Sequence, residues 1–344
     1  PAPGVMQKNR SCVENTRRGK TNRRRFEKGM NMETSNLGRS SLRASRLIYG
    51  CMRIVGTWNP NEIDAKRREN ARKAIVAAWE AGYTHYDHAD IYCHGACEQV
   101  FGEVMRDTPG MREKILITTK CGIRFPDDPV EGAPKRYDFS SEYIIQSCEG
   151  SLKRLGVDTI DVYLLHRPDV LMEPAEVADA FEKLRSAGKV REFGVSNFTP
   201  SQIQTLQASL PMALACHQVQ IHPGRLGPFT DGTLDQCLRE QMTPTAWSPV
   251  AGGMFAEGGA VPQQHPNRRQ MVELVVELDK IAEEAGVDRS VVTLAWLMRH
   301  PAGILPIIGS TNPQRIAAAA GADGLDLDRE QWYRIYAAAG GALP

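Results

Sequence analysis

Short apolar runs alternate with amphipathic stretches along the chain from residue 46 onward. The runs are rich in β-branched and aromatic residues, as is typical of strands, whereas apolar residues three and four positions apart are typical of helices. The paired pattern repeats eight times. Strands are predicted at 46–52, 84–87, 114–120, 159–166, 190–196, 214–220, 243–249 and 304–309. Helices are predicted at 64–81, 97–106, 140–155, 174–187, 200–209, 231–240, 268–298 and from about 313.

Polar residues close seven of these predicted strands, and most of them are 22 to 46 positions apart. Because the carboxyl ends of parallel strands meet at one end of a closed sheet, the pattern predicts an α/β fold, a (β/α)8 TIM barrel with its functional site at that end. The interval from 248 to 310 holds two helical patterns, so we expect extra helices. The closing residues are Asp87, Lys120, His166, Ser196, Gln218, Ser248 and Ser310.

A doubly wound parallel sheet would give a similar alternation of strands and helices. The chain contains no G-x-G-x-x-G motif after the first predicted strand and no phosphate-binding G-x-x-x-x-G-K-[ST] motif. The two commonest nucleotide-binding signatures of such sheets are therefore missing. This comparison favours the barrel.

The first 33 residues differ in composition from the rest. Residues 1–31 hold nine Lys and Arg against two Glu, have no periodic apolar face and lack the apolar segment of an export signal. We expect a disordered leader at 1–33, followed by the barrel at 34–344. An over-long start upstream of Met30 or Met32 is favoured over a nucleic-acid-binding or organelle-targeting arm, and whether the leader belongs to the native protein stays open.

Composition and cysteine usage describe an ordinary globular protein. The 344 residues are 42% hydrophobic and 24% charged, with a net charge of +1. No apolar run approaches the roughly 18 residues of a membrane span. Eight cysteines are scattered, and the only close pair, Cys93 and Cys97, lacks a second pair at zinc-site spacing. We therefore expect reduced thiols, no metal, no membrane or nucleic-acid partner, and a cytoplasmic location.

The segment YTHYDHADIYCHG at 83–95 begins as a strand and then turns polar at Asp87, where an apolar core could not absorb unpaired groups. Tyr92 follows five positions later, Lys120 ends ILITTK and His166 ends VYLLH. Together with GVSNF, HQVQIHP, AWSPVAGG and LPIIGSTNPQRI, these segments resemble the aldo-keto reductases over residues 46–340. The ending DREQWYRIYAAA is similar to a bacterial, functionally obscure branch of that superfamily.

The resemblance implies NAD(P)H-dependent reduction of an aldehyde or ketone, with Asp87, Tyr92, Lys120 and His166 as catalytic residues. Hydride transfer to a carbonyl leaves negative charge on oxygen, which calls for a proton donor at that atom. A phenol with a pKa of about 10 is a weak acid unless its phenolate is stabilised. An ammonium held charged by a carboxylate supplies that stabilisation, and an imidazole can bind the same oxygen. Tyr92 is thus the expected proton donor.

The resemblance also implies a nicotinamide dinucleotide at the strand ends. Ser196, Asn197 and Gln218 would hold the nicotinamide amide and Trp247 would stack on its ring, although SNFTPSQ is also a helix cap at Thr199. NADPH is preferred over NADH because Ser310, Thr311 and Arg315 resemble a clamp on the 2′-phosphate; Gly309 stands where lysine is frequent, which keeps NAD as an alternative. The remaining expected cofactor contacts are Gly50, Cys51, Met52, Ser248, Val250 and Gly252.

Other polar residues of 83–98 have structural interpretations. We expect His85 and His88 to be structural, Asp90 to support a turn or to hold a catalytic residue in place from behind, and Glu98 to cap the next helix or pair with a cation. The thiol of Cys93 should lie near the mouth of the site. The segments 121–141 and 251–269 are expected to be loops without regular structure above the barrel. In the first of them, a solvated loop is favoured over contacts to an acidic substrate by Arg124, Lys135, Arg136 and Tyr137.

Two other functions stay open from the sequence alone. The first is a metal-dependent barrel hydrolase, although no H-x-H pair lies on one strand face. The second is a regulatory subunit that binds the cofactor without turning it over, as the ion-channel β-subunits of this superfamily do. The sequence gives neither the physiological substrate nor the oligomeric state. The possible metal ligands are His85, Asp87, His166, His217 and His222.

Overall fold

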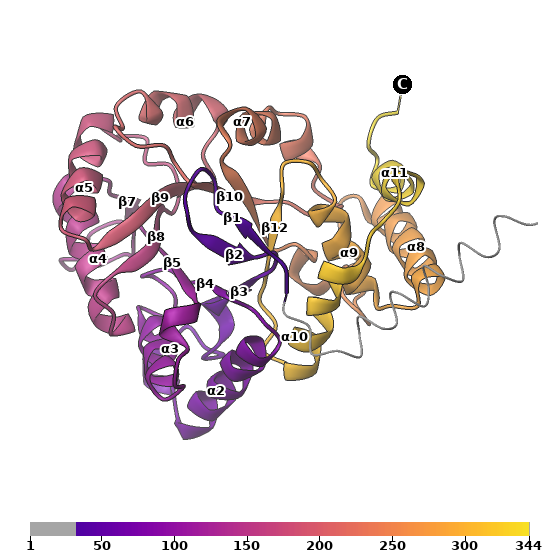
Figure 1. Ribbon diagram of the computed structural model, residues 1–344, viewed down its shortest axis with the longest axis horizontal. Coiled ribbons are helices and arrows are strands. Elements are labelled where there is room, and N and C mark those ends of the chain that lie inside the picture. The colour runs from indigo at the N-terminus through magenta and orange to yellow at the C-terminus, as the bar shows by residue number, and fades with distance from the viewer. Residues whose placement is uncertain (1–31, 344) are drawn as a thin grey trace, which may run out of the picture. The chain divides into compact units, whose positions relative to one another are not determined.

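Eight parallel strands form a closed barrel in the computed structural model, which describes residues 32–343 (Figure 1). Around the barrel they follow chain order, with β12 pairing with β3 to close the ring. All eight predicted strands and the (β/α)8 architecture are confirmed. The strands are β3 (Ile48–Gly50), β4 (His85–Asp87), β5 (Leu116–Cys121), β8 (Ile160–Leu165), β9 (Val190–Ser196), β10 (Cys216–Gln220), β11 (Thr243–Trp247) and β12 (Leu305–Ile308).

Helices follow the barrel strands and surround them. Side chains of Asp64, Ser140, Thr199 and Asn312 cap helix N-termini by accepting from backbone amides. Two helices, α8 and α9, lie between β11 and β12, so the expected extra helix is present. The helices are α2 (Ala65–Glu80), α3 (Ala96–Arg106), α4 (Ser141–Leu155), α5 (Pro174–Ser186), α6 (Pro200–Gln207), α7 (Thr233–Glu240), α8 (Arg268–Ala285), α9 (Arg289–Met298), α10 (Pro313–Ala320) and α11 (Arg329–Ala338).

A β-hairpin that the sequence pattern did not predict precedes the barrel. Strands β1 (Thr34–Asn36) and β2 (Arg43–Ser45) pair antiparallel, and Leu37 and Leu42 between them are buried. These leucines belong to one apolar cluster with Leu116 and Leu305, the first residues of β5 and β12. The hairpin therefore covers the amino-terminal end of the barrel and leaves the other end for chemistry.

The predicted leader lies almost wholly outside the described residues, which begin at Met32. That residue is buried, and the backbone amide of Glu33 donates to Asp323 at 2.7 Å. The last two residues assigned to the leader are thus already in contact with the folded chain.

One expected loop contains regular structure. Within 121–141, β6 (Ile123–Arg124) pairs antiparallel with β7 (Arg136–Tyr137), so the expectation of a structureless segment is wrong there. Arg124 forms ion pairs with Asp128 at 3.0 Å and Asp138 at 2.9 Å. These two ion pairs stabilise the conformation of the loop.

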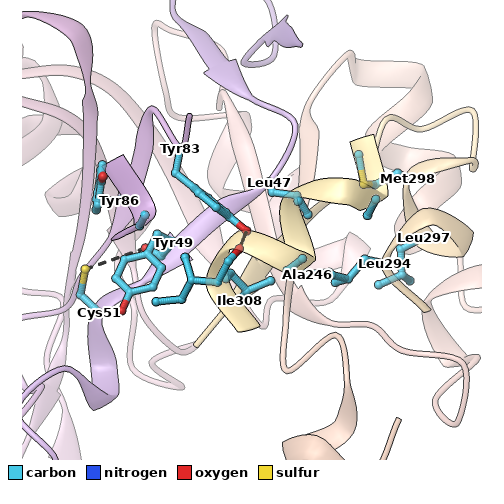
Figure 2. Packing of buried hydrophobic residues seen from close by; sticks show 14 of the residues in the cluster. Leu47, Tyr49, Cys51, Tyr83, Tyr86, Ala246, Leu294, Leu297, Met298 and Ile308 are labelled. Atoms are coloured by element: carbon cyan, nitrogen blue, oxygen red, sulfur yellow. Dashed lines mark hydrogen bonds between the residues drawn. The ribbon is translucent and has the colours of Figure 1, made fainter. Parts of the chain in front are cut away.

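A cluster of tyrosines near β3 and β4 contacts the segment that holds the β12–α10 turn and the start of α10 (Figure 2). Tyr49 and Tyr83 are fully buried, and their hydroxyls donate to the carbonyls of Ser310 and Ile316, both at 3.1 Å. Buried hydroxyls need such partners, so the apolar bodies of the rings and their polar ends act together. The cluster fixes the turn between β12 and α10, which carries the expected phosphate clamp.

The last helix is attached through two tryptophans. The indole of Trp296 donates to the carbonyl of Trp332, and the indole of Trp332 donates to the carbonyl of Trp296, both at 3.1 Å. Their rings stack with centroids 5.1 Å apart. Across residues 32–343, none of the helices has both the length and the apolar character needed to cross a membrane.

Candidate active site

Side chains from successive barrel strands converge at the carboxyl-terminal end. Asp87 is the last residue of β4, Lys120 is the fifth residue of β5, and Gln218 lies within β10. His166 directly follows β8. In parallel strands these ends lie at one rim of the barrel, the usual position of a barrel enzyme's site. The structure thus brings together residues that are up to 131 positions apart in the chain.

The ammonium of Lys120 is at the centre of this group. Its side chain is fully buried, and Nζ donates to Asp87 Oδ2 at 2.8 Å, to the carbonyl of His88 at 2.6 Å and to Tyr92 Oη at 3.2 Å. Burial acts to lower the pKa of Lys120, but the charge of Asp87 and the phenol of Tyr92 outweigh it and raise the pKa above its usual value. The amine is therefore a charged donor with all three of its N–H groups used.

The carboxylate of Asp87 is held on its other side by Gln218, whose Nε2 donates to Oδ1 at 2.8 Å. The resemblance assigned Gln218 to the nicotinamide amide. In the structure its amide nitrogen is bonded to Asp87, so this residue orients the carboxylate that pairs with Lys120. Sequence reasoning missed that link, as well as the His88 carbonyl, since neither leaves a signal in the chain.

Tyr92 lies against this ammonium with 8% of its surface exposed. Burial raises the pKa of the phenol to about 12, while the charge of Lys120 acts in the opposite direction. The ring of His166 meets that of Tyr92 edge-on with centroids 6.0 Å apart. Burial, together with Lys120 and Arg167, holds the pKa of His166 well below its usual value, so its imidazole is neutral. A neutral imidazole can donate a hydrogen bond to an oxygen bound beside the Tyr92 hydroxyl.

A second polar group lies at the ends of β9 and β11. Asn197 adopts a left-handed backbone with φ of +63°. Its Nδ2 donates to Ser196 Oγ at 2.8 Å and to the carbonyl of His166 at 3.2 Å, and its Oδ1 accepts from the Trp247 indole at 2.9 Å. The cap at Thr199 is present as a full capping box, so the structural interpretation of SNFTPSQ is confirmed. This helix cap is compatible with the cofactor contacts that the resemblance implies for Ser196 and Asn197.

The first strand ends beside the site in a close contact. A Cβ on Gly50 would lie 2.9 Å from Ile307 Cγ2 and 3.1 Å from the carbonyl of Ile308, so only glycine lets β3 approach β12 this closely. Cys51 is fully buried beside Tyr49 and Tyr86, as Figure 2 shows, so only its backbone can face the mouth. Cys93 is also buried, at 1% exposure.

The expected phosphate clamp lies between β12 and α10. Gly309, Thr311 and Arg315 are exposed, and in the described part of the chain no acidic side chain pairs with Arg315. The amide of Arg315 donates to Asn312 Oδ1 at 3.1 Å and that of Asn312 to Ser310 Oγ at 3.2 Å. These two backbone amides are thus used within the turn. The guanidinium remains available.

The turn after β11 is compact and strained. Ser248 and Ala251 have φ of +51° and +49°, and Gly252 has φ of +69°. Left-handed conformations at non-glycine residues cost free energy and often occur at functional sites. Val250 and Gly252 lie in the same turn as these residues, at the rim where the resemblance put cofactor contacts.

The remaining polar residues near Asp87 have structural contacts. His85 Nε2 is 2.6 Å from Thr118 Oγ1, and the ring of His88 lies 4.5 Å from that of Phe101. Glu98 is fully buried and pairs with Arg154 at 2.7 Å, which confirms the expected cation partner. Among residues 32–343, no three His, Cys, Asp or Glu side chains gather where they could hold a metal ion.

Comparisons with known proteins agree with this geometry. The family model described as "Aldo/keto reductase family" matches residues 46–339. The uncharacterized oxidoreductase YcsN of Bacillus subtilis is 39% identical over 306 residues, covering 87% of this chain and 96% of YcsN. A 6-dehydroglucose reductase of Novosphingobium aromaticivorans is 38% identical over 311 residues, covering 89% of this chain and 95% of that enzyme.

The solved structures give the same result for the fold. The holo form of the aldo-keto reductase AKR11C1 from Bacillus halodurans superposes with a TM-score of 0.76 at 25% identity, covering 91% of this chain and 98% of that one. The family model spans most of the chain, and the two relatives above exceed 30% identity over nearly their whole length. This chain belongs to the aldo/keto reductase family of oxidoreductases.

Proposed function

We propose that this protein reduces an aldehyde or ketone to an alcohol with NADPH, and that Tyr92 donates the proton. The observation that carries the proposal is the contact of Lys120 Nζ with both Asp87 Oδ2 at 2.8 Å and Tyr92 Oη at 3.2 Å. The bound cofactor supplies the hydride. The protein has to supply a proton and a place for the negative charge that develops on the carbonyl oxygen.

Tyr92 can do this only if its phenolate is stabilised, because burial disfavours the ionised form. The charged Lys120 lies within hydrogen-bonding distance and lowers that cost, while Asp87 and Gln218 hold the amine in position. Neutral His166 would donate a second hydrogen bond to the substrate oxygen from its ring. The proton then passes from Tyr92 Oη to the oxygen as the carbonyl accepts hydride.

The residues of the cofactor side suit a dinucleotide phosphate. The side chains of Ser196 and Asn197 are hydrogen-bonded to each other next to the proposed proton donor. Asn197 also accepts a hydrogen bond from the indole of Trp247 and fixes that ring. The exposed guanidinium of Arg315 has no acidic partner in the described chain and suits a 2′-phosphate, to which arginine can make paired hydrogen bonds. These features favour NADPH, and NADH stays the alternative cofactor because Gly309 offers no cation to the 2′-phosphate.

A carbonyl screen with both reduced cofactors tests the proposal. Purified protein should oxidise NADPH, followed at 340 nm, in the presence of a reactive aromatic aldehyde such as a nitrobenzaldehyde. A six-carbon sugar aldehyde belongs in the same panel, since two bacterial relatives are named 6-dehydroglucose reductases. Binding of NADPH without turnover of any carbonyl would contradict the proposal and favour a regulatory subunit.

A further inference from the structure

The loop that carries Tyr92 is strained where it turns into α3. Cys93 and His94 adopt left-handed backbones with φ of +47° and +53°, followed by Gly95 with φ of +85°. A side chain at residue 95 would collide with Arg154, since its Cβ would lie 2.5 Å from Arg154 Cδ. Strained non-glycine residues persist only where the surroundings hold them, so this loop needs anchors.

One anchor is Asp90, midway between Asp87 and Tyr92. Its amide donates to the carbonyl of Lys120 at 3.1 Å, and its Oδ2 accepts from the hydroxyl of Ser147 on α4 at 2.6 Å. Asp90 therefore ties the loop both to the strand that carries the catalytic amine and to the helix outside it. Its other oxygen, Oδ1, is buried and has no hydrogen-bond partner.

The second anchor is the start of α3. Glu98 Oε1 accepts from Thr119 Oγ1 at 2.5 Å and Oε2 pairs with Arg154 at 2.7 Å. Thr119 directly precedes Lys120, and Arg154 and Ser147 both belong to α4. Asp90 and Glu98, one on each side of Tyr92, thus attach the short loop that carries this tyrosine to both β5 and α4.

We propose, on the basis of the reductase function above, that Asp90 is a positioning residue, which holds the loop at 88–95 so that the phenol of Tyr92 reaches Lys120. Its carboxyl acts through Ser147, while its backbone amide holds the carbonyl of Lys120. A misplacement of about 1 Å at a reacting group can cost about 10²-fold in rate.

The surroundings of Asp90 also shift the pKa of its carboxyl group. Burial raises the pKa of its carboxyl to about 7, and nearby Glu98 acts in the same direction, whereas Ser147, Arg154 and the Ile91 amide oppose them. Ionisation of Asp90 is therefore unfavourable in the folded loop. The titratable and charged groups facing Asp90 are Glu98 from α3, Tyr143 and Arg154 from α4, Cys121 from β5 and Tyr163 from β8.

Three variants and one matched control test the anchor by steady-state kinetics with NADPH and an aromatic aldehyde. Asp90→Ala should lower kcat at least tenfold with the KM for NADPH changed less than twofold, Ser147→Ala should lower kcat by a smaller factor, and Asp90→Asn should restore kcat to within threefold of wild type. Ser141→Ala is the control, since it removes a 2.7 Å bond from the same helix to Asp179, away from the loop.

Amide hydrogen exchange over 88–95 supplies a readout that does not depend on turnover. Asp90→Ala should speed exchange there at least tenfold, and Ser141→Ala should leave it unchanged. A kcat for Asp90→Ala within twofold of wild type, or equal losses in the control, would overturn the positioning role while the reductase function stands. If the wild type reduces no carbonyl, the proposed function fails, and unchanged loop exchange in Asp90→Ala would defeat the anchor separately.

Discussion

Two carboxylates are buried toward opposite ends of the barrel, and the cations that pair with them differ in their exposure to solvent. Asp87, at the carboxyl end, pairs with a lysine that is fully buried. Asp161, near the start of β8, pairs with Arg112 and Arg191, whose side chains are 31% and 49% exposed. A cation in contact with water is screened and does little to its neighbours. The buried one instead donates to Tyr92 Oη and acts to lower the pKa of that phenol, against the larger effect of burial.

Backbone strain is commoner at the carboxyl end, although Gln241, with φ of +53°, lies just before β11 at the amino end. Left-handed non-glycine residues follow the strands at the carboxyl end, at Cys93, His94, Asn197, Ser248 and Ala251. At the amino end, the β1–β2 hairpin packs Leu37 and Leu42 against the barrel. There Asp161 also accepts a hydrogen bond from the amide of Ile117 at 2.9 Å. One end is built for chemistry and the other for stability, which is the division expected of this fold.

The largest effect should come from removing the proposed proton donor. Tyr92→Phe should lower kcat by about 10²–10⁴ because general acid catalysis contributes that much, with NADPH affinity nearly unchanged. Stopped-flow or steady-state kinetics measure kcat, and fluorescence titration measures NADPH binding. Tyr163→Phe, which removes a buried hydroxyl bonded to the Ile144 carbonyl, is the matched control and should keep its kcat. A fully active Tyr92→Phe would defeat the assignment.

The next effect concerns the opposite end. Asp161→Ala leaves the buried amide of Ile117 without an acceptor, so the free energy of unfolding should fall by about 1–3 kcal/mol. Because Asp161 contacts no residue of the proposed site, kcat should stay within twofold of wild type. Urea unfolding and steady-state kinetics on the same preparation check both statements. A large loss of kcat without a loss of stability would break the comparison between the two ends.

A smaller effect tests the cofactor preference. Arg315→Ala should raise the KM for NADPH about tenfold, or about 1.4 kcal/mol, through loss of a charge-assisted contact to the 2′-phosphate. The KM for NADH should change less than twofold, because NADH lacks that group. Equal changes for both cofactors would make Arg315 a structural residue only.

The smallest effect is a pH dependence of stability. The pKa of Asp90 is raised to about 7 in the folded protein, above its ordinary value, so folding is favoured in acid and stability is lost as pH rises toward 7. Asp90→Asn cannot ionise. Between pH 5 and pH 7 its unfolding free energy should therefore rise relative to wild type by about 1 kcal/mol, below the limit of about 2.7 kcal/mol for two units. Urea unfolding at the two pH values measures the difference, and a fall would contradict the raised pKa.

Much of this organisation could be predicted because a polar residue that ends an apolar run is visible in the sequence. Asp87, Lys120 and His166 each end such a run, and eight repeats of one pattern predict a barrel. The β1–β2 hairpin could not be predicted, because its strands are three residues long and its leucines are buried only by distant strands. The bond from Gln218 to Asp87 spans 131 positions and likewise exists only after the barrel closes.

The three hydrogen bonds of Lys120 have a consequence for the protein's own chemistry. Aldehydes condense with neutral amines to form imines, and a primary amine next to the carbonyl site would be at risk of that reaction. In this structure the amine is an ammonium that donates to a carboxylate, a carbonyl and a phenol, so it has no lone pair to offer. The ammonium that acts to lower the pKa of the phenol would thus also be protected from the carbonyl substrate of the proposed reaction.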